Sequence, residues 1–236
     1  MKNTLGRRCT AEFIGTTFLL IAVVGSGIMA ERLAGGNGAV ALIANVFAIS
    51  AALTALILTF GPISGAHFNP AVTICDVIVG GTSARDSVFY VAVQLLGAAF
   101  GTILANLMFS LPAVITATKV RSGPAQWLGE LIAAFGLLSV IWGTSRLHKP
   151  VVVPFAVSGY IIGAIWFTSS TSFANPAVTL ARTLSDTFTG IRPSDAPAFI
   201  LFQMIGAIAA TLLFRWLVPS EKAAEIVMPH GGDMEP

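Results

Sequence analysis

The pentapeptide Asn-Pro-Ala-Val-Thr occurs twice in this chain, at 69–73 and at 175–179, both times in apolar, glycine-rich surroundings. Asparagine is a favoured N-cap residue of helices, and proline suits the first helical position, where its missing N–H costs nothing. Each copy therefore predicts the start of a helix. Because a capping asparagine uses its side-chain oxygen on the backbone, we expect both amide hydrogens of Asn69 and Asn175 to be free donors.

The composition places these motifs in a membrane. Hydrophobic residues make up 55% of the 236 residues and charged residues only 10%, whereas about 25% of an ordinary soluble domain is charged. A helix needs about 20 apolar residues to cross the hydrocarbon core. Six segments of the chain are long enough, namely 11–30, 39–60, 87–109, 127–144, 151–167 and 198–217.

The two Asn-Pro-Ala segments lie outside these six spans. The apolar run 69–79 and the similar run 175–183 are each long enough for only about half a bilayer, at about 1.5 Å per residue. Non-helical backbone at membrane depth is tolerated only where protein buries it or where it lines a watery cavity. The loops before the motifs, 61–68 and 169–174, therefore predict a cavity where two half-helices meet at their asparagines.

The chain also contains an internal duplication. Glu12 in the first span corresponds to Glu130 in the fourth, and the motif Gln-x-x-Gly-Ala at Gln94 in the third span recurs at Gln203 in the sixth. Since each unit has three spans, an odd number, the second unit must be inverted relative to the first, an arrangement that places a site at the bilayer midplane.

We therefore predict an all-α membrane protein with six transmembrane helices and two re-entrant half-helices. Residues 1–236 are expected to form a single transmembrane channel domain, with inverted repeats at about 10–110 and 126–218 and a polar tail at 219–236. With the N-terminus inside, eight Lys and Arg residues fall on the cytoplasmic side and five outside, which favours cytoplasmic termini in a cell membrane.

These features resemble those of a known family. Two Asn-Pro-Ala boxes on inverted repeats, the segment Ser-Gly-Ala-His-Phe at 64–68 and the Ala-Glu-Phe of the first span are similar to the major intrinsic proteins, which include the aquaporins and aquaglyceroporins. The resemblance covers about residues 10–217. It implies a homotetramer in the lipid bilayer, in which every subunit has its own pore for passive conduction of water or small neutral solutes. No cofactor, metal site or nucleic-acid partner is expected.

The resemblance also implies which residues form the pore. The dipoles of the two half-helices place partial positive charge at their meeting point, so cations should be repelled there while the asparagine donors bind a neutral oxygen. The central residues are Asn69, Pro70, Ala71, Asn175, Pro176 and Ala177. Backbone carbonyls of the two loops are expected to supply acceptors along one wall, from Gly65, Ala66, His67, Thr171, Ser172 and Phe173.

The sequence departs from the family pattern at the outer selectivity filter. Most members have an arginine directly after the second Asn-Pro-Ala, where this chain has Val178. Arg182 lies one helical turn, about 6 Å, further on, and whether it contributes stays open. The other filter positions, carried over by their offsets from the asparagines, are Ile49, Gly163 and Ser172. The predicted ring is wide and uncharged.

A ring of this kind suits solutes larger than water. The sequence favours an aquaglyceroporin-like channel for glycerol, urea or metalloid acids such as arsenite, and some bacterial members with valine at this position, associated with arsenic handling, resemble it. A water-selective aquaporin is the alternative. An ion-coupled secondary transporter also uses inverted repeats and broken helices, but coupling needs a protonatable or cation-binding group at the midplane.

The remaining polar residues favour no catalytic function. No Ser/His/Asp, Cys/His or metal-ligand constellation is visible in the spans, so an enzyme is not expected. Glu12 and Glu130 are ionisable groups inside spans and are therefore functional candidates by default. We interpret them as structural acceptors for hydrogen bonds from the re-entrant loops. Asp76 lies toward the cytoplasmic end of the first half-helix and is expected to be solvated.

Overall fold

The predicted all-α fold is confirmed. The computed structural model describes residues 3–145 and 151–217, and all regular elements in those ranges are helices. The α-helices are α1 (Leu5–Leu20), α2 (Ser26–Leu33), α3 (Gly38–Ser64), α4 (Pro70–Val79), α5 (Ala84–Met108), α6 (Pro124–Ser145), α7 (Val152–Phe167), α8 (Pro176–Ala181) and α9 (Ala196–Leu217). Three shorter elements are the π-helix η1 (Ile21–Gly25) and the 3-10 helices η2 (Arg182–Leu184) and η3 (Pro193–Asp195).

The long helices match the predicted spans. α1, η1 and α2 form one continuous helix of 29 residues, which is long and apolar enough to cross a membrane. The same is true of α3, α5, α6 and of η3 together with α9. The remaining span is α7, with 16 described residues. Large apolar side chains such as Val88, Leu96 and Trp216 are 64–74% exposed, which suits helices that face lipid. The predicted tail at 219–236 lies outside the described residues.

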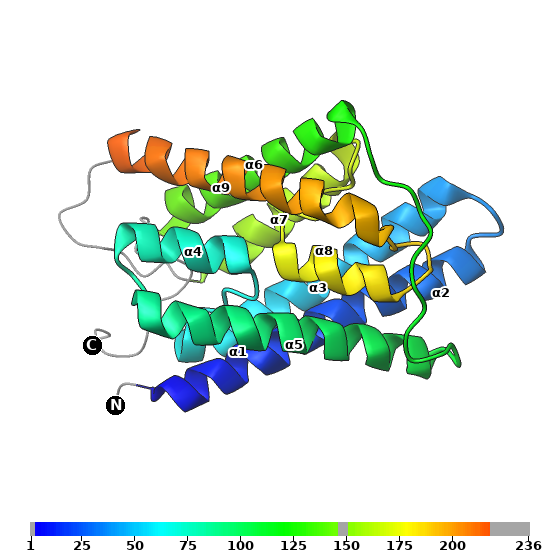
Figure 1. Ribbon diagram of the computed structural model, residues 1–236, viewed down its shortest axis with the longest axis horizontal. Coiled ribbons are helices and arrows are strands. Elements are labelled where there is room, and N and C mark those ends of the chain that lie inside the picture. Colours follow the sequence, from blue (N-terminus) through cyan, green and yellow to red (C-terminus); the bar gives the residue numbers. More distant parts are fainter. Residues whose placement is uncertain (1–2, 146–150, 218–236) are drawn as a thin grey trace.

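The two repeats run in opposite directions. In Figure 1, α1 begins at the end of the molecule where α9 finishes, whereas α6 begins at the opposite end. The half-helices α4 and α8 lie between the long helices and point toward each other from the two ends (Figure 1). This is the inverted arrangement that the duplicated motifs predict.

Two corresponding glycines bring the long helices together. A Cβ atom added at Gly97 of α5 would lie 2.5 Å from the carbonyl oxygen of Phe13 in α1. A Cβ atom at Gly206 of α9 would lie 2.2 Å from the carbonyl oxygen of Leu131 in α6. Only glycine permits such close backbone approach, so the repeated Gln-x-x-Gly-Ala motif fixes the same helix pair in both repeats.

The ends of α3 and α4 show how the first re-entrant loop is formed. The residues that directly follow α3 and α4 are Gly65 and Gly80, whose φ angles are +88° and +85°. Such left-handed residues commonly end helices, and glycine adopts the conformation without a Cβ clash. The four residues between Gly65 and Pro70 then turn the chain back at membrane depth.

Candidate pore and selectivity filter

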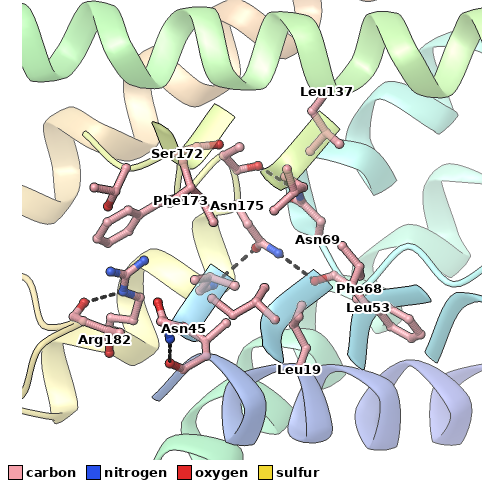
Figure 2. A pocket seen from close by; sticks show the side chains of 18 of the residues that line it. Leu19, Asn45, Leu53, Phe68, Asn69, Leu137, Ser172, Phe173, Asn175 and Arg182 are labelled. Atoms are coloured by element: carbon pink, nitrogen blue, oxygen red, sulfur yellow. Dashed lines mark hydrogen bonds between the residues drawn. The ribbon is translucent and has the colours of Figure 1, made fainter. Parts of the chain in front are cut away.

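The two half-helices meet through their capping asparagines. The side-chain oxygen of Asn69 accepts a hydrogen bond from the N–H of Ala71 at 2.9 Å, and Asn175 accepts one from Ala177 at 2.9 Å. Both side chains point to the centre of the cavity in Figure 2, where each reaches across to the other loop. Asn69 donates to the carbonyl of Ala174 and Asn175 to that of Phe68, both at 2.8 Å.

These crossing bonds modify one expectation. The sequence predicts that both amide hydrogens of each asparagine are free, but one of the two is used to join the repeats. Each amide group has two N–H bonds, so the second donor of each asparagine has no acceptor in the part of the chain that the structure describes. Asn69 and Asn175 both line the cavity.

The two buried glutamates hold the re-entrant loops. The carboxylate of Glu12 accepts hydrogen bonds from the backbone N–H groups of His67 at 3.0 Å and Phe68 at 2.7 Å. Glu130 accepts the equivalent bonds from Phe173 and Ala174, both at 2.9 Å. Both glutamates are fully buried, and these contacts correspond to the structural role inferred from the sequence.

A glutamine completes each network. Gln94 donates from its amide nitrogen to Glu12 at 2.8 Å and to the hydroxyl of Thr73 at 2.9 Å. Gln203 donates in the same way to Glu130 and Thr179. The repeated Glu, Asn-Pro-Ala-x-Thr and Gln-x-x-Gly-Ala elements are therefore one bonded unit that occurs twice. This unit fixes the position of each half-helix against its repeat.

The loop backbone supplies a row of acceptors. Ala66, Phe68, Thr171, Ser172 and Ala174 have positive φ angles between 47° and 62°, a conformation that costs non-glycine residues about 1–3 kcal/mol each. The carbonyls of Phe68 and Ala174 accept the crossing asparagine bonds. Those of Ala66, Thr171, Ser172 and Phe173 accept no hydrogen bond from the part of the chain that the structure describes. These carbonyls belong to cavity-lining residues, whereas Gly65 is not in the lining.

The cavity has a volume of about 330 Å³ and two different walls. The re-entrant loops form the polar wall. The facing wall consists mainly of branched apolar side chains from α1, α3, α6 and α7, including Leu19, Leu53, Ile57, Leu137, Ile141 and Val157. A solute in the cavity would therefore bond on one side and contact hydrocarbon on the other.

Three of the four predicted filter positions line the cavity. Ile49, Ser172 and Val178 are among its wall residues, but Gly163 is not. On α7 the lining residues are Ile161 and Ile165, each two positions from Gly163. Two residues correspond to about 200° around a helix, so Gly163 points away from the wall. A fixed offset of 12 residues from Asn175 selects the wrong helix face here, and Ile165, at an offset of 10, faces the cavity.

Cationic side chains line part of the cavity. Arg182 is only 6% exposed, its Nε donates to the carbonyl of Thr189, and its guanidinium carbon lies 3.3 Å from the ring centre of Phe173. Figure 2 shows this guanidinium beside the Phe173 ring. Arg121 and Lys119, from the segment that joins the repeats, also line the cavity. The sequence left Arg182 open and gave no reason to choose Arg121.

The first half-helix has a different pair at the corresponding positions. Asp76 and Arg182 each lie seven residues after their asparagine, and His67 and Phe173 each lie two residues before it. A carboxylate oxygen of Asp76 is 3.7 Å from Nε2 of His67. Asp76 is 1% exposed, so the expectation that it is solvated was wrong. It packs back toward the re-entrant loop instead of ending in solvent.

Comparison with known proteins agrees with this architecture. Residues 1–169 match the family model described as major intrinsic protein, so the chain belongs to the major intrinsic protein family. It is 52% identical over 214 residues to the aquaglyceroporin AqpS of Rhizobium meliloti, with 91% of each chain covered.

More distant relatives show the same fold family. The chain is 31% identical over 245 residues to the aquaporin AqpM of Methanothermobacter marburgensis, covering 91% of this chain and 98% of AqpM. The X-ray structure of the aquaglyceroporin from Plasmodium falciparum superposes with a TM-score of 0.65 at 21% identity, covering 91% of this chain and 95% of that one. At this identity the structural match supports the fold alone.

Proposed function

We propose that this protein is a passive membrane channel for water and small neutral solutes of the polyol, urea or metalloid-acid type. One observation carries the proposal. Two half-helices, joined by crossing asparagine bonds at 2.8 Å, open onto a cavity of about 330 Å³ that has carbonyl acceptors on one wall and apolar side chains on the other. Likeness to an aquaglyceroporin at 52% identity supports the same function.

The chemistry of the lining favours neutral, oxygen-rich solutes. Two helix N-termini point at the centre, where the helix dipoles disfavour cations. The polar wall offers acceptors and a few donors, which suit a molecule with several hydroxyl groups. Val178 stands where most family members have an arginine, and its shorter side chain leaves more room for a solute larger than water. Membership of a family of channels favours transport over catalysis.

The assembly and orientation follow from the family resemblance and the charge distribution. We propose a homotetramer in the cell membrane with a pore in every subunit and both termini in the cytoplasm. Apolar side chains on the outer surfaces of the described helices, such as Phe47 and Phe155 at 59–62% exposure, are available to lipid and to neighbouring subunits.

Stopped-flow light scattering on proteoliposomes tests the function. We expect water, glycerol and arsenite to enter vesicles with the protein faster than protein-free vesicles. Asn175→Asp should lower these fluxes, because a carboxylate cannot donate to the Phe68 carbonyl. Asn37→Asp is the matched control, since Asn37 caps α3 on an exposed surface and its replacement should leave the fluxes unchanged.

Two outcomes separate this proposal from its alternatives. Water entry without glycerol or arsenite entry would identify a water-selective channel. Solute flux that depends on a pH gradient or on membrane potential would instead indicate a coupled transporter. We expect flux that follows only the solute gradient.

A further inference from the structure

The segment that joins the two repeats delivers a buried arginine to the outer pore. The Nε of Arg121 donates to the carbonyl of Gly190 at 2.9 Å, and its Nη1 donates to the carbonyl of Ser170 at 3.2 Å and to the hydroxyl of Thr171 at 3.3 Å. Its backbone N–H donates to the carboxylate of Asp195 at 2.9 Å. The residue is 7% exposed and lines the cavity. These bonds fix a guanidinium group against the second re-entrant loop.

A second guanidinium lies in the same part of the cavity. The guanidinium carbon of Arg182 is 3.3 Å from the ring centre of Phe173, and that of Arg121 is 5.0 Å from the same ring. Phe173 precedes Asn175 by two residues, and Arg182 follows Val178 by one helical turn. Both cations therefore lie beside Phe173, in the loop that leads into the half-helix of Val178, the filter position without a charge.

These charges are not neutralised by direct ion pairs. Among the described residues, no carboxylate lies within ion-pair distance of the guanidinium group of Arg121 or Arg182. Glu130 acts on both only at longer range, and its oxygens already accept bonds from the loop and Gln203. Burial lowers the pKa of Arg121 to about 10, which still leaves it protonated at neutral pH.

We propose that Arg121, together with Arg182, supplies the guanidinium charge and donors that position 178 lacks, and so sets the solute selectivity of the outer pore. The inference rests on the channel function proposed above. A fixed positive charge in a water-poor constriction repels cations more strongly than it would in bulk water. The guanidinium N–H groups can also bind the oxygens of neutral solutes, while the short Val178 side chain keeps the passage wide.

The test compares a cation with a neutral solute of similar size. Methylammonium and urea entry are measured on the same vesicles, and their ratio cancels differences in the number of active channels. Arg121→Met and Arg182→Met each remove one charge at similar side-chain length, and Arg121→Lys keeps the charge but loses the planar fork. The matched control is Arg32→Met, because Arg32 is an exposed arginine near the same end of the molecule that does not line the cavity.

We expect the methylammonium-to-urea ratio to rise about tenfold or more in Arg121→Met and in Arg182→Met, from the loss of one nearby charge. Arg32→Met should match the original protein. Arg121→Lys should keep the ratio within about twofold of that protein. A purely structural Arg121 would instead make the lysine and methionine variants equally defective in total flux, with an unchanged ratio.

The possible failures can be told apart. A wild-type protein that conducts no urea above protein-free vesicles would defeat the channel function itself. Normal urea conduction with an unchanged ratio in both methionine variants would overturn only the role of the two arginines. If Arg121→Met does not fold, Arg182→Met decides the question, since the side chain of Arg182 makes a single hydrogen bond to the described residues.

Discussion

Replacing Glu130 by glutamine tests the origin of the re-entrant loop. The two carboxylate oxygens of Glu130 accept separate bonds, one from the N–H of Phe173 and one from that of Ala174, each at 2.9 Å. Glutamine has nearly the same shape but only one acceptor oxygen. It can therefore accept from one of these N–H groups, and its own NH₂ group must face the other.

The expected cost follows from this mismatch. A buried N–H without a partner costs about 1–3 kcal/mol, and a hydrogen bond to a charged group contributes about 1.5–3 kcal/mol. The bond to Gln203 need not be lost, because Gln203 and Ala174 donate to the same carboxylate oxygen and Phe173 donates to the other. The glutamine can keep its oxygen at the first position and place its NH₂ group toward Phe173. We therefore expect Glu130→Gln to lower the free energy of unfolding by about 3 kcal/mol, which is a factor of about 150 in the folding equilibrium.

The measurement is an equilibrium unfolding titration in mixed micelles with increasing sodium dodecyl sulfate, followed by circular dichroism. Glu31→Gln makes the same chemical change at an exposed residue of α2 and should stay within about 0.5 kcal/mol of the original protein. A loss below about 1 kcal/mol for Glu130→Gln would show that the two loop N–H groups find other acceptors. The carboxylate of Glu130 would then not be what holds the second re-entrant loop in place.

Three further predictions concern packing, size selection and pH. Gly97→Ala should lower stability by about 1–3 kcal/mol in the same titration, because its Cβ would lie 2.5 Å from the Phe13 carbonyl oxygen, whereas Gly159→Ala has open space and should be neutral. Val178→Arg should reduce glycerol entry more than water entry in swelling assays, and equal losses would contradict the wide filter. Burial lowers the pKa of Arg121 only to about 10, so Arg121 stays charged at neutral pH. The methylammonium-to-urea ratio should therefore be constant between about pH 6 and about pH 8. A ratio that rises with pH within this window would count against a role for the Arg121 charge.

The sequence predicts the parts of the molecule that repeat. Two copies of Asn-Pro-Ala, with glutamate before and Gln-x-x-Gly-Ala after each, were sufficient to indicate the inverted repeats, the half-helices and the partners of Glu12 and Glu130. The reason is that these residues act through local rules. A cap starts a helix, glycine permits close approach, and a buried carboxylate needs donors.

The parts that do not repeat could not be predicted in this way. Gly163 was placed by counting 12 residues back from Asn175 through the irregular segment between α7 and α8. A difference of two residues in such a count moves the position by about 200° around the helix. Arg121 lies in an irregular segment whose path depends on its bonds to Gly190 and Asp195. Its approach to the pore arises from tertiary contacts between residues about 50–75 positions apart, for which local sequence gives no signal.

The crossing asparagine bonds make the two halves of the protein depend on each other. Each half carries an asparagine amide that donates to a carbonyl of the opposite loop and a carbonyl that accepts from the opposite asparagine. A polypeptide ending after α5 would leave both groups unsatisfied in the middle of the bilayer, where an unpaired polar group costs several kcal/mol. Either half made alone should therefore be degraded or insert without its re-entrant segment. Producing both halves as separate polypeptides in one cell should restore the crossing asparagine bonds.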